Sequence, residues 1–276
     1  MGDPRLPTAA SLDSLVAATI RAAVSPAVRA ALGELSYHGE IDSTNAELLR
    51  RSRSDPRDRL VSIADMQKQG RGRQGRTWRQ RPGGGLALSM LKRFDGPMAG
   101  LAGLSLAAGT ACVAALEDCG LGDIGLKWPN DLFSGGRKLG GILVELGGAA
   151  AGPCHAVVGI GINLQLGEAG AALDQPWTDL ATLGHGHEPS RNQLAARILD
   201  RLCPALDHFA VHGFAPFQEA FAERDVLRDR PVRVLVGGAS RSGTARGVDG
   251  RGALRVAFED GEQVFDAAEI RLERLA

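Results

Sequence analysis

A run of alternating glycine and arginine is the segment whose residue types most clearly imply chemistry: Gly70-Arg71-Gly72-Arg73-Gln74-Gly75-Arg76-Thr77-Trp78. The surrounding stretch, residues 66–94, has eight Lys or Arg residues and no Asp or Glu, although the whole chain has zero formal net charge. Glycine lets the backbone approach a ligand closely, and arginine supplies planar, permanently charged donors. The run therefore indicates a site for a polyphosphate, a carboxylate or a nucleic-acid backbone.

Other interpretations of this run fit less well. Gly70, Gly72 and Gly75 spell G-x-G-x-x-G after an expected strand, but a dinucleotide site needs a helix to follow, and Pro82 with three glycines after it argues against one. The P-loop sequence G-x-x-x-x-G-K-[ST] does not occur. A disordered RNA-binding tract would need repeated copies and aromatic residues between them. A solvated surface loop would not require glycine between the arginines.

A second group of candidate residues lies further along the chain. Lys127-Trp128-Pro129-Asn130-Asp131-Leu132 follows an expected strand, and Pro129 keeps Trp128 extended before a turn at Asn130-Asp131. Two more segments combine strand patterns with glycine pairs: Arg137-Lys138-Leu139-Gly140-Gly141-Ile142-Leu143-Val144-Glu145 and Gly159-Ile160-Gly161-Ile162-Asn163. Because glycine weakens strands, its use in successive strands suggests a ligand lying across one face of a sheet; for each pair alone, a β-bulge remains an alternative.

The bulk composition is that of a globular chain of 276 residues, with 44% hydrophobic and 23% charged residues. Equal numbers of basic and acidic residues, 32 each, argue against general binding to nucleic acid or to a membrane surface. The four cysteines form no CxxC pair and the N-terminus has no apolar signal core, so we expect reduced thiols and a cytoplasmic location. The charge-free, Ala-rich stretch Gly96–Leu116 is expected to be a buried helix.

The elements that must position these residues follow from periodicity and caps. We expect strands over residues 35–41, 59–67, 86–93, 124–128, 138–146 and 155–166, with a Gly135-Gly136 hairpin between the fourth and fifth. Helices are expected to start at Ser11, Ser25-Pro26, Asp42-Ser43, Pro97, Ser190 (a capping box with Gln193) and Phe214. Residues 167–189 are expected to form a long loop. From Asp229 onward, short apolar runs between glycines predict a small barrel of about five strands.

Taken together and in this order, these motifs and Asp42-Ser43-Thr44-Asn45 with Gln67 resemble the biotin protein ligase family. The resemblance covers residues 37 to the C-terminus. It implies an α+β fold: a central mixed sheet of the class II aminoacyl-tRNA synthetase type with helices, followed by a small C-terminal β-barrel of the Src-homology-3-like type. We expect an N-terminal helical segment over residues 1–34, a catalytic domain over 35–226 and the barrel over 227–276.

The resemblance implies that biotin and ATP give biotinyl-5′-AMP, whose biotin passes to a lysine of the biotin carboxyl carrier protein of acetyl-CoA carboxylase. It places one group of residues at biotin: Ser43, Thr44, Asn45, Gln67, Arg71, Gly72, Arg73 and Lys138. It places another at ATP and the adenylate: Trp78, Lys127, Asn130 and Asn163. Lys138, Arg71 and Arg73 are the implied catalytic residues. We expect no resident metal ion; Mg²⁺ would arrive with ATP, and Asp131 could help to hold it.

Two departures from the family pattern bear on function. Only 41 residues precede Asp42, and few of them are basic, so we expect a ligase that does not bind DNA and is not a membrane protein. Near the C-terminus Glu273 stands where the family often has an arginine, with Arg274 offset by one. A homodimer is compatible with the family. The alternatives are a lipoate or octanoyl ligase of the same fold, whose known members lack the Gly/Arg run, and a biotin-responsive transcriptional regulator.

Two histidine pairs are expected to be ordinary. His208 and His212 are four residues apart on one helix face, but no third ligand lies near them in the sequence. His185 and His187 lie in the long loop and carry no further signal.

Overall fold

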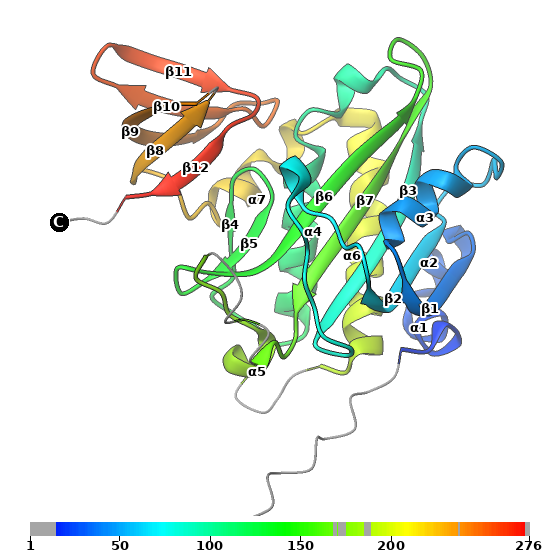
Figure 1. The fold of residues 1–276 in the computed structure, drawn as a ribbon. Helices are drawn as coiled ribbons and strands as arrows, with labels where there is room; N and C mark the ends of the chain where they lie inside the picture. The colour runs from blue at the N-terminus through cyan, green and yellow to red at the C-terminus, as the bar shows by residue number, and fades with distance from the viewer. Residues whose placement is uncertain (1–14, 168–169, 171–174, 185–188, 237, 274–276) are drawn as a thin grey trace, which may run out of the picture.

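The computed structural model describes residues 15–167, 170, 175–184, 189–236 and 238–273. Its centre is a seven-stranded mixed sheet in the order β1-β2-β3-β7-β6-β5-β4 (Figure 1). The strands are β1 (Leu35–Ile41), β2 (Val61–Gln67), β3 (Gly85–Phe94), β4 (Gly125–Lys127), β5 (Asp131–Ser134), β6 (Arg137–Gly148) and β7 (Cys154–Asn163). β1 and β2 pair in parallel and the other neighbours are antiparallel. The expected α+β fold with a mixed central sheet is confirmed.

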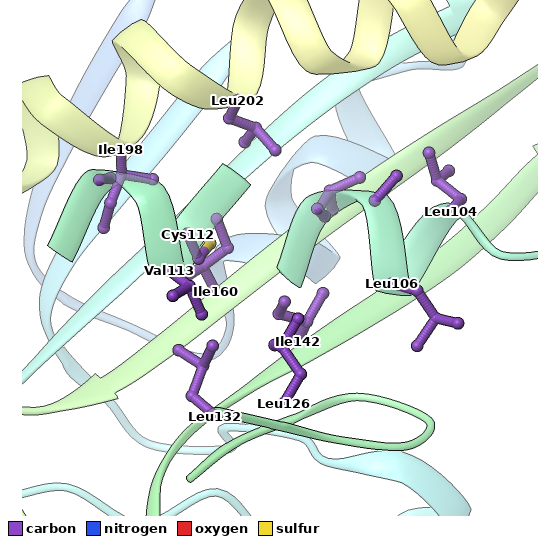
Figure 2. Packing of buried hydrophobic residues seen from close by; sticks show 14 of the residues in the cluster. Leu104, Leu106, Cys112, Val113, Leu126, Leu132, Ile142, Ile160, Ile198 and Leu202 are labelled. Atoms are coloured by element: carbon purple, nitrogen blue, oxygen red, sulfur yellow. The ribbon is translucent and has the colours of Figure 1, made fainter. Parts of the chain in front are cut away.

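The helices divide between the two faces of this sheet. They are α1 (Ala17–Ala23), α2 (Pro26–Ala31), α3 (Thr44–Arg51), α4 (Leu104–Asp118), α5 (Leu180–Leu183), α6 (Arg191–His212) and α7 (Gln218–Ala222). α4 and α6 pack on each other and on one face, where side chains of both helices meet those of the strands (Figure 2). α3 lies on the other face, where Leu48 packs with Leu91 in a small separate cluster. That second face carries the candidate site.

Several local predictions are confirmed. β1 has the expected bounds, Ser25 caps α2 with Pro26 at its first turn, and Ser43 caps α3. Ser190 and Gln193 form the expected capping box at the start of α6. The apolar stretch ending at Asp118 is long enough to cross a membrane, but most of it is buried inside the protein, as a core helix would be. The helix start expected at Ser11 lies outside the described residues.

Two predictions about element boundaries are wrong. The helix expected to start at Pro97 begins only at Leu104, after a short 3₁₀ helix (Met98–Leu101) and a left-handed Gly103 with φ +79°. Glycine is needed at this break, because the backbone is left-handed and a Cβ at Gly103 would lie 2.7 Å from Phe214. The Gly135-Gly136 hairpin joins β5 to β6, because the supposed turn at Asp131 opens a short strand with buried Leu132 and Phe133.

A second, five-stranded antiparallel sheet follows in the order β11-β10-β9-β8-β12. Its strands are β8 (Pro231–Val236), β9 (Ala239–Val248), β10 (Leu254–Phe258), β11 (Gly261–Phe265) and β12 (Glu269–Leu272). The expected five-stranded C-terminal β unit is confirmed, although no ladder joins β11 to β12 among the described residues, so hydrogen bonding does not close the barrel. Trp128 Nε1 donates to the Gly252 carbonyl at 2.9 Å and ties this unit to the central sheet.

Candidate active site

The N-terminus of α3 forms one wall of the site. Ser43 is its N-cap and accepts from the Ala46 N–H, which leaves Thr44 and Asn45 in the first turn, both almost fully buried. The Thr44 N–H and hydroxyl both lie within hydrogen-bond distance of Gln67 Oε1, at 2.9 and 3.1 Å. The residues that sequence analysis placed at biotin on α3 and β2 are therefore in contact with one another.

Asn45 reaches across the sheet to three strands. Its Oδ1 lies 2.6 Å from Ser89 Oγ on β3, and its Nδ2 donates to the Leu143 carbonyl and to Glu145 Oε2 on β6. Gly159 on β7 lies directly beneath, and a Cβ there would collide with the Asn45 amide. This glycine thus makes room for a side chain of the protein itself.

The Gly/Arg run forms a closed loop whose two ends are joined by backbone hydrogen bonds. Trp78 N donates to the Gly70 carbonyl at 2.8 Å, and Gly72 N donates to the Arg76 carbonyl at 2.7 Å. A Cβ at Gly70 would lie 2.5 Å from the Trp78 carbonyl, so the close approach of the two ends requires glycine. Only a 3₁₀ turn (Arg73–Gly75) interrupts the loop, which agrees with rejecting a dinucleotide-binding helix.

Two carboxylates hold arginines of this loop. Arg71 Nη2 lies 3.1 Å from Glu145 Oε2, the same oxygen that accepts from Asn45, so Glu145 connects the loop to α3. Arg76 Nη2 lies 2.7 Å from Glu269 Oε2 on β12, which connects the loop to the second sheet. Sequence analysis gave neither Glu145 nor Glu269 a role, because only the fold brings them to the loop.

Trp78 ends the loop and packs against β7. A Cβ at Gly161 would lie 2.6 Å from Cε2 of the Trp78 indole, so this glycine also makes room for a side chain of the protein. Lys138 Nζ lies 5.9 Å from the centre of the Trp78 ring, within the range of a cation–π contact. Trp78 and Lys138, 60 residues apart in the sequence, therefore share one end of the site.

Several cations lie near the carboxylates of Asp131 and Glu269 at this end. Lys138 Nζ pairs with Asp131 Oδ1 at 2.6 Å. Burial lowers the pKa of Lys127; the Asp131 carboxylate opposes this shift and the Lys138 charge adds to it. Burial also lowers the pKa of Arg73, again opposed by Asp131. Four cations, Lys127, Lys138, Arg73 and Arg76, near two carboxylates, Asp131 and Glu269, leave a net positive field, which suits an anion such as a phosphate.

The two asparagines expected on the adenylate side both hold main-chain groups. Asn130 Nδ2 donates to the Ile142 carbonyl at 2.8 Å, and the Ile142 N–H donates back to the Asn130 carbonyl. Asn163, 4% exposed, donates from Nδ2 to the carbonyls of Thr178 and, at 3.4 Å, Lys138. In this state both amides position strands around Lys138.

A segment that sequence analysis treated only as loop also reaches Lys138. Lys138 N donates to the Pro176 carbonyl at 3.0 Å, and Thr178 N donates to the Lys138 carbonyl at 2.9 Å, so Trp177 pairs with Lys138 like a strand residue. The buried Asp179 caps α5 and also accepts from the Leu166 N–H. Residues 168–169, 171–174 and 185–188 of the expected long loop, 167–189, lie outside the described residues.

The remaining candidates take no part in this site. The rings of His208 and His212 pack on each other with centres 4.6 Å apart, and no group of three metal-ligating side chains occurs in the described part of the chain. His185 and His187 lie outside it. Burial raises the pKa of the Cys112 thiol to about 12 and that of Cys203 to about 11, which disfavours thiolate chemistry. Glu273 accepts from Arg233 and Ser242, away from the loop, and Arg274 is not described.

Comparisons with known proteins agree with this fold and site. Residues 38–163 match the model of the Biotin/lipoate A/B protein ligase family, and residues 229–272 match that of the Biotin protein ligase C terminal domain. The solved biotin protein ligase of Aquifex aeolicus, in complex with biotin and ATP, superposes with a TM-score of 0.75 at 26% identity, covering 88% of this chain and 100% of that one.

Full-length relatives narrow the assignment. The biotin--[acetyl-CoA-carboxylase] ligase of Paracoccus denitrificans is 34% identical over 83% of this chain and 96% of its own length. The bifunctional ligase/repressor BirA of Escherichia coli is 38% identical over 80% of this chain and 68% of its own. The chain belongs to the biotin protein ligase family.

Proposed function

We propose that this protein activates biotin with ATP, forming biotinyl-5′-AMP and pyrophosphate, and then transfers biotin to a lysine of a biotin carboxyl carrier protein. The observation that carries the proposal is the layout of one sheet face. The polar side chains of Thr44, Asn45 and Gln67 lie at one end, and the cations near Asp131 lie at the other. A substrate with a polar ring at one end and a carboxylate tail at the other would match these two groups.

The chemistry explains the need for this charge distribution. In the first step a biotin carboxylate oxygen attacks the α-phosphorus of ATP, and the bond from that phosphorus to the bridging oxygen breaks to release pyrophosphate. Both reactants are anions, so fixed positive charge lowers the barrier by offsetting their repulsion. Lys138 is proposed to lie between the carboxylate and the phosphate, exchanging its contact with Asp131 for contacts with the reacting oxygens. No covalent enzyme nucleophile is required.

The other cations have supporting roles. Burial lowers the pKa values of Lys127 and Arg73, which means that their positive charges are less well stabilised here than in water. A bound phosphate would relieve that cost. We propose that Lys127 and Arg73 contact the phosphate side, while Arg71 closes the loop over biotin through Glu145.

Mg²⁺ fits this arrangement as a companion of ATP. The described residues contain no cluster of three metal-ligating side chains, and Asp131 is the carboxylate that pairs with Lys138. Mg²⁺ is commonly held by one or two carboxylates together with substrate phosphates, which one carboxylate satisfies. Asp131 would hold the ion, which would neutralise part of the phosphate charge.

The acyl-adenylate hydrolyses in water, so closure of the site is part of the proposal. We propose that residues 70–76 and 167–176 close over the ligands, with Trp78 as the fixed end of the first loop. We propose that the chain has an N-terminal helical segment (1–34), a catalytic domain (35–226) and a C-terminal β unit (227–276). We also propose that the protein acts in the cytoplasm and without binding DNA. A homodimer stays compatible with the family.

The test is direct. The protein is incubated with ATP, Mg²⁺ and biotin, and pyrophosphate release and biotin transfer to a purified carrier domain are measured. Lipoate and octanoate are tested in place of biotin in separate incubations. We expect a signal only with biotin. A protein that is active with lipoate, or inactive with all three acids, would contradict the proposal.

A further inference from the structure

Ser89 occupies the centre of the sheet face beneath α3. It is 0% exposed, and in the strand register it lies between Ser62 on β2 and Gly159 on β7. Its Oγ lies 2.6 Å from Asn45 Oδ1 and 2.7 Å from Thr44 Oγ1. Sequence analysis gave this serine no role, yet it contacts both residues at the start of α3.

The direction of each hydrogen bond here follows from main-chain groups and acceptors. Asn45 Nδ2 faces the Leu143 carbonyl and the Glu145 carboxylate, which can only accept, so the amide oxygen must face Ser89. The Thr44 N–H, which can only donate, lies 2.9 Å from Gln67 Oε1 and fixes that amide in turn. The positions of the oxygen and the nitrogen in the side-chain amides of Asn45 and Gln67 are therefore fixed by their partners.

The protons do not suffice for all contacts. Three oxygen–oxygen contacts run in series, from Asn45 Oδ1 to Ser89 Oγ, from Ser89 Oγ to Thr44 Oγ1, and from Thr44 Oγ1 to Gln67 Oε1. Each needs a hydroxyl proton, and only Ser89 and Thr44 have one each. The longest contact, 3.1 Å between Thr44 and Gln67, is the one left without a proton, because Gln67 already accepts from the Thr44 N–H.

The order of donation then follows. Ser89 donates to Asn45, because a buried amide oxygen without a partner is costly. Thr44 then donates to Ser89, and both Thr44 Oγ1 and Gln67 Oε1 keep lone pairs for a ligand. These two oxygens offer a ligand two acceptors, which suits a group with N–H donors. The ureido ring of biotin has two N–H groups, whereas lipoate and octanoate have none.

We propose that Ser89 is a specificity-determining positioning residue: it draws the Thr44 proton away from Gln67 and so keeps Thr44 and Gln67 as an acceptor pair for a cyclic urea. The inference rests on the proposed function and explains how that function selects its acid. Without the Ser89 hydroxyl, Thr44 donates to Gln67 instead, and this occupies the Gln67 lone pair that a ligand N–H would use.

Two substitutions separate donation from packing. Ser89→Ala removes the donor. Ser89→Cys keeps a side chain of similar shape, but its S–H donates only weakly. We expect both to raise the biotin Kd, measured by calorimetry, about tenfold, since one hydrogen bond to the ligand is lost. The Kd for ATP and the kcat at saturating biotin should change less than about twofold, because the cation end is untouched.

Ser62 supplies the matched control. It pairs with Ser89 across β2 and β3 and is also 0% exposed, but its Oγ has no hydrogen-bond partner within the described residues. Ser62→Ala and Ser62→Cys should bind biotin as the unmodified protein does. An unchanged biotin Kd in Ser89→Cys, or an equal loss in Ser62→Ala, would overturn the assignment. If Ser89→Ala does not fold, Ser89→Cys decides alone. If the unmodified protein binds no biotin, the proposed function itself has failed.

Discussion

Replacing Gly161 with alanine tests whether Trp78 must pack against β7 for ATP to be used. A Cβ at this position would lie 2.6 Å from Cε2 and 2.7 Å from Cζ2 of the indole, and real Cβ contacts essentially never fall below 3.0 Å. The strand cannot shift, because Gly161 pairs with Ala87 on one side and Gly141 on the other. The indole must therefore move.

The size of the effect follows from what Trp78 contacts. Keeping the indole in place would cost about 1–3 kcal/mol of overpacking, so a partly exposed ring at a loop end moves outward instead. It then loses its position 5.9 Å from Lys138 Nζ, a contact worth about 0.5–1 kcal/mol at exposed sites, and its proposed place beside the adenylate. We expect a KM for ATP about tenfold higher, equivalent to about 1.4 kcal/mol, with the biotin Kd little changed.

Steady-state pyrophosphate release measures this effect, and Gly39→Ala is the matched control. Gly39 is also a strand glycine, but the nearest atom to its added Cβ, Tyr37 Oη, is 3.8 Å away. A double-mutant cycle with Trp78→Ala identifies the cause, since Gly161→Ala should add almost nothing once the ring is absent. A normal KM for ATP in Gly161→Ala, or an equal loss in the Trp78→Ala background, would refute the reasoning.

Three further predictions concern charge. Lys138→Ala should lower kcat for adenylation at least about a hundredfold, because a fixed charge at the reacting oxygens is lost. Lys68 pairs with Glu40 at the surface, so Lys68→Ala should leave the rate of pyrophosphate release unchanged. Equal rates in the two variants would show that Lys138 takes no part in the chemistry. Because the pKa of Lys127 is lowered, the folded protein binds fewer protons there than the unfolded chain, so this group contributes more to stability as pH rises towards 10.5. Affinity for ATP needs the charged form and should fall over the same pH range. Lys127→Arg should abolish this alkaline loss in a profile of KM for ATP against pH, and a profile identical to that of the unmodified protein would exclude Lys127. Burial raises the pKa of Asp225 from 3.8 to about 6, so stability falls as pH rises through this interval. Asp225→Asn can still accept from the Leu227 N–H and should raise the unfolding free energy at pH 8 by up to about 3 kcal/mol. An increase of the same size at pH 4 would show that another cause is responsible.

Local signals in the sequence predicted local structure well. The caps at Ser43 and Ser190 depend on a side chain and a backbone N–H three residues away, so the residues themselves contain the whole interaction. The glycine-rich C-terminal runs predicted five strands for a similar reason, because each hairpin is set by its own turn. The order of motifs along the chain was enough to indicate the family.

Features that depend on distant partners were missed. Ser89 stands in the run Leu-Ala-Leu-Ser-Met-Leu, which indicates only a buried strand; its contact with Asn45 spans 44 residues. Glu145 meets Asn45 across 100 residues. Position 103 needs glycine because Phe214 packs against it, and no local pattern in the sequence indicates this contact. Register and packing, rather than residue type, decide these positions.

The strand glycines illustrate the difference between the two levels. Their repetition in successive strands suggested a ligand lying across one sheet face. The structure instead fills the space above Gly159 with Asn45 and the space above Gly161 with Trp78, and leaves only ordinary contacts above Gly141, whose added Cβ would lie 3.5 Å from Asp131. Gly159 and Gly161 therefore let α3 and the Gly/Arg loop approach the sheet closely, so that the Asn45 amide and the Trp78 indole flank the proposed site. On this basis alanine at Gly159 should weaken biotin binding, and alanine at Gly161 should weaken ATP use, although the two positions lie on one face of one strand.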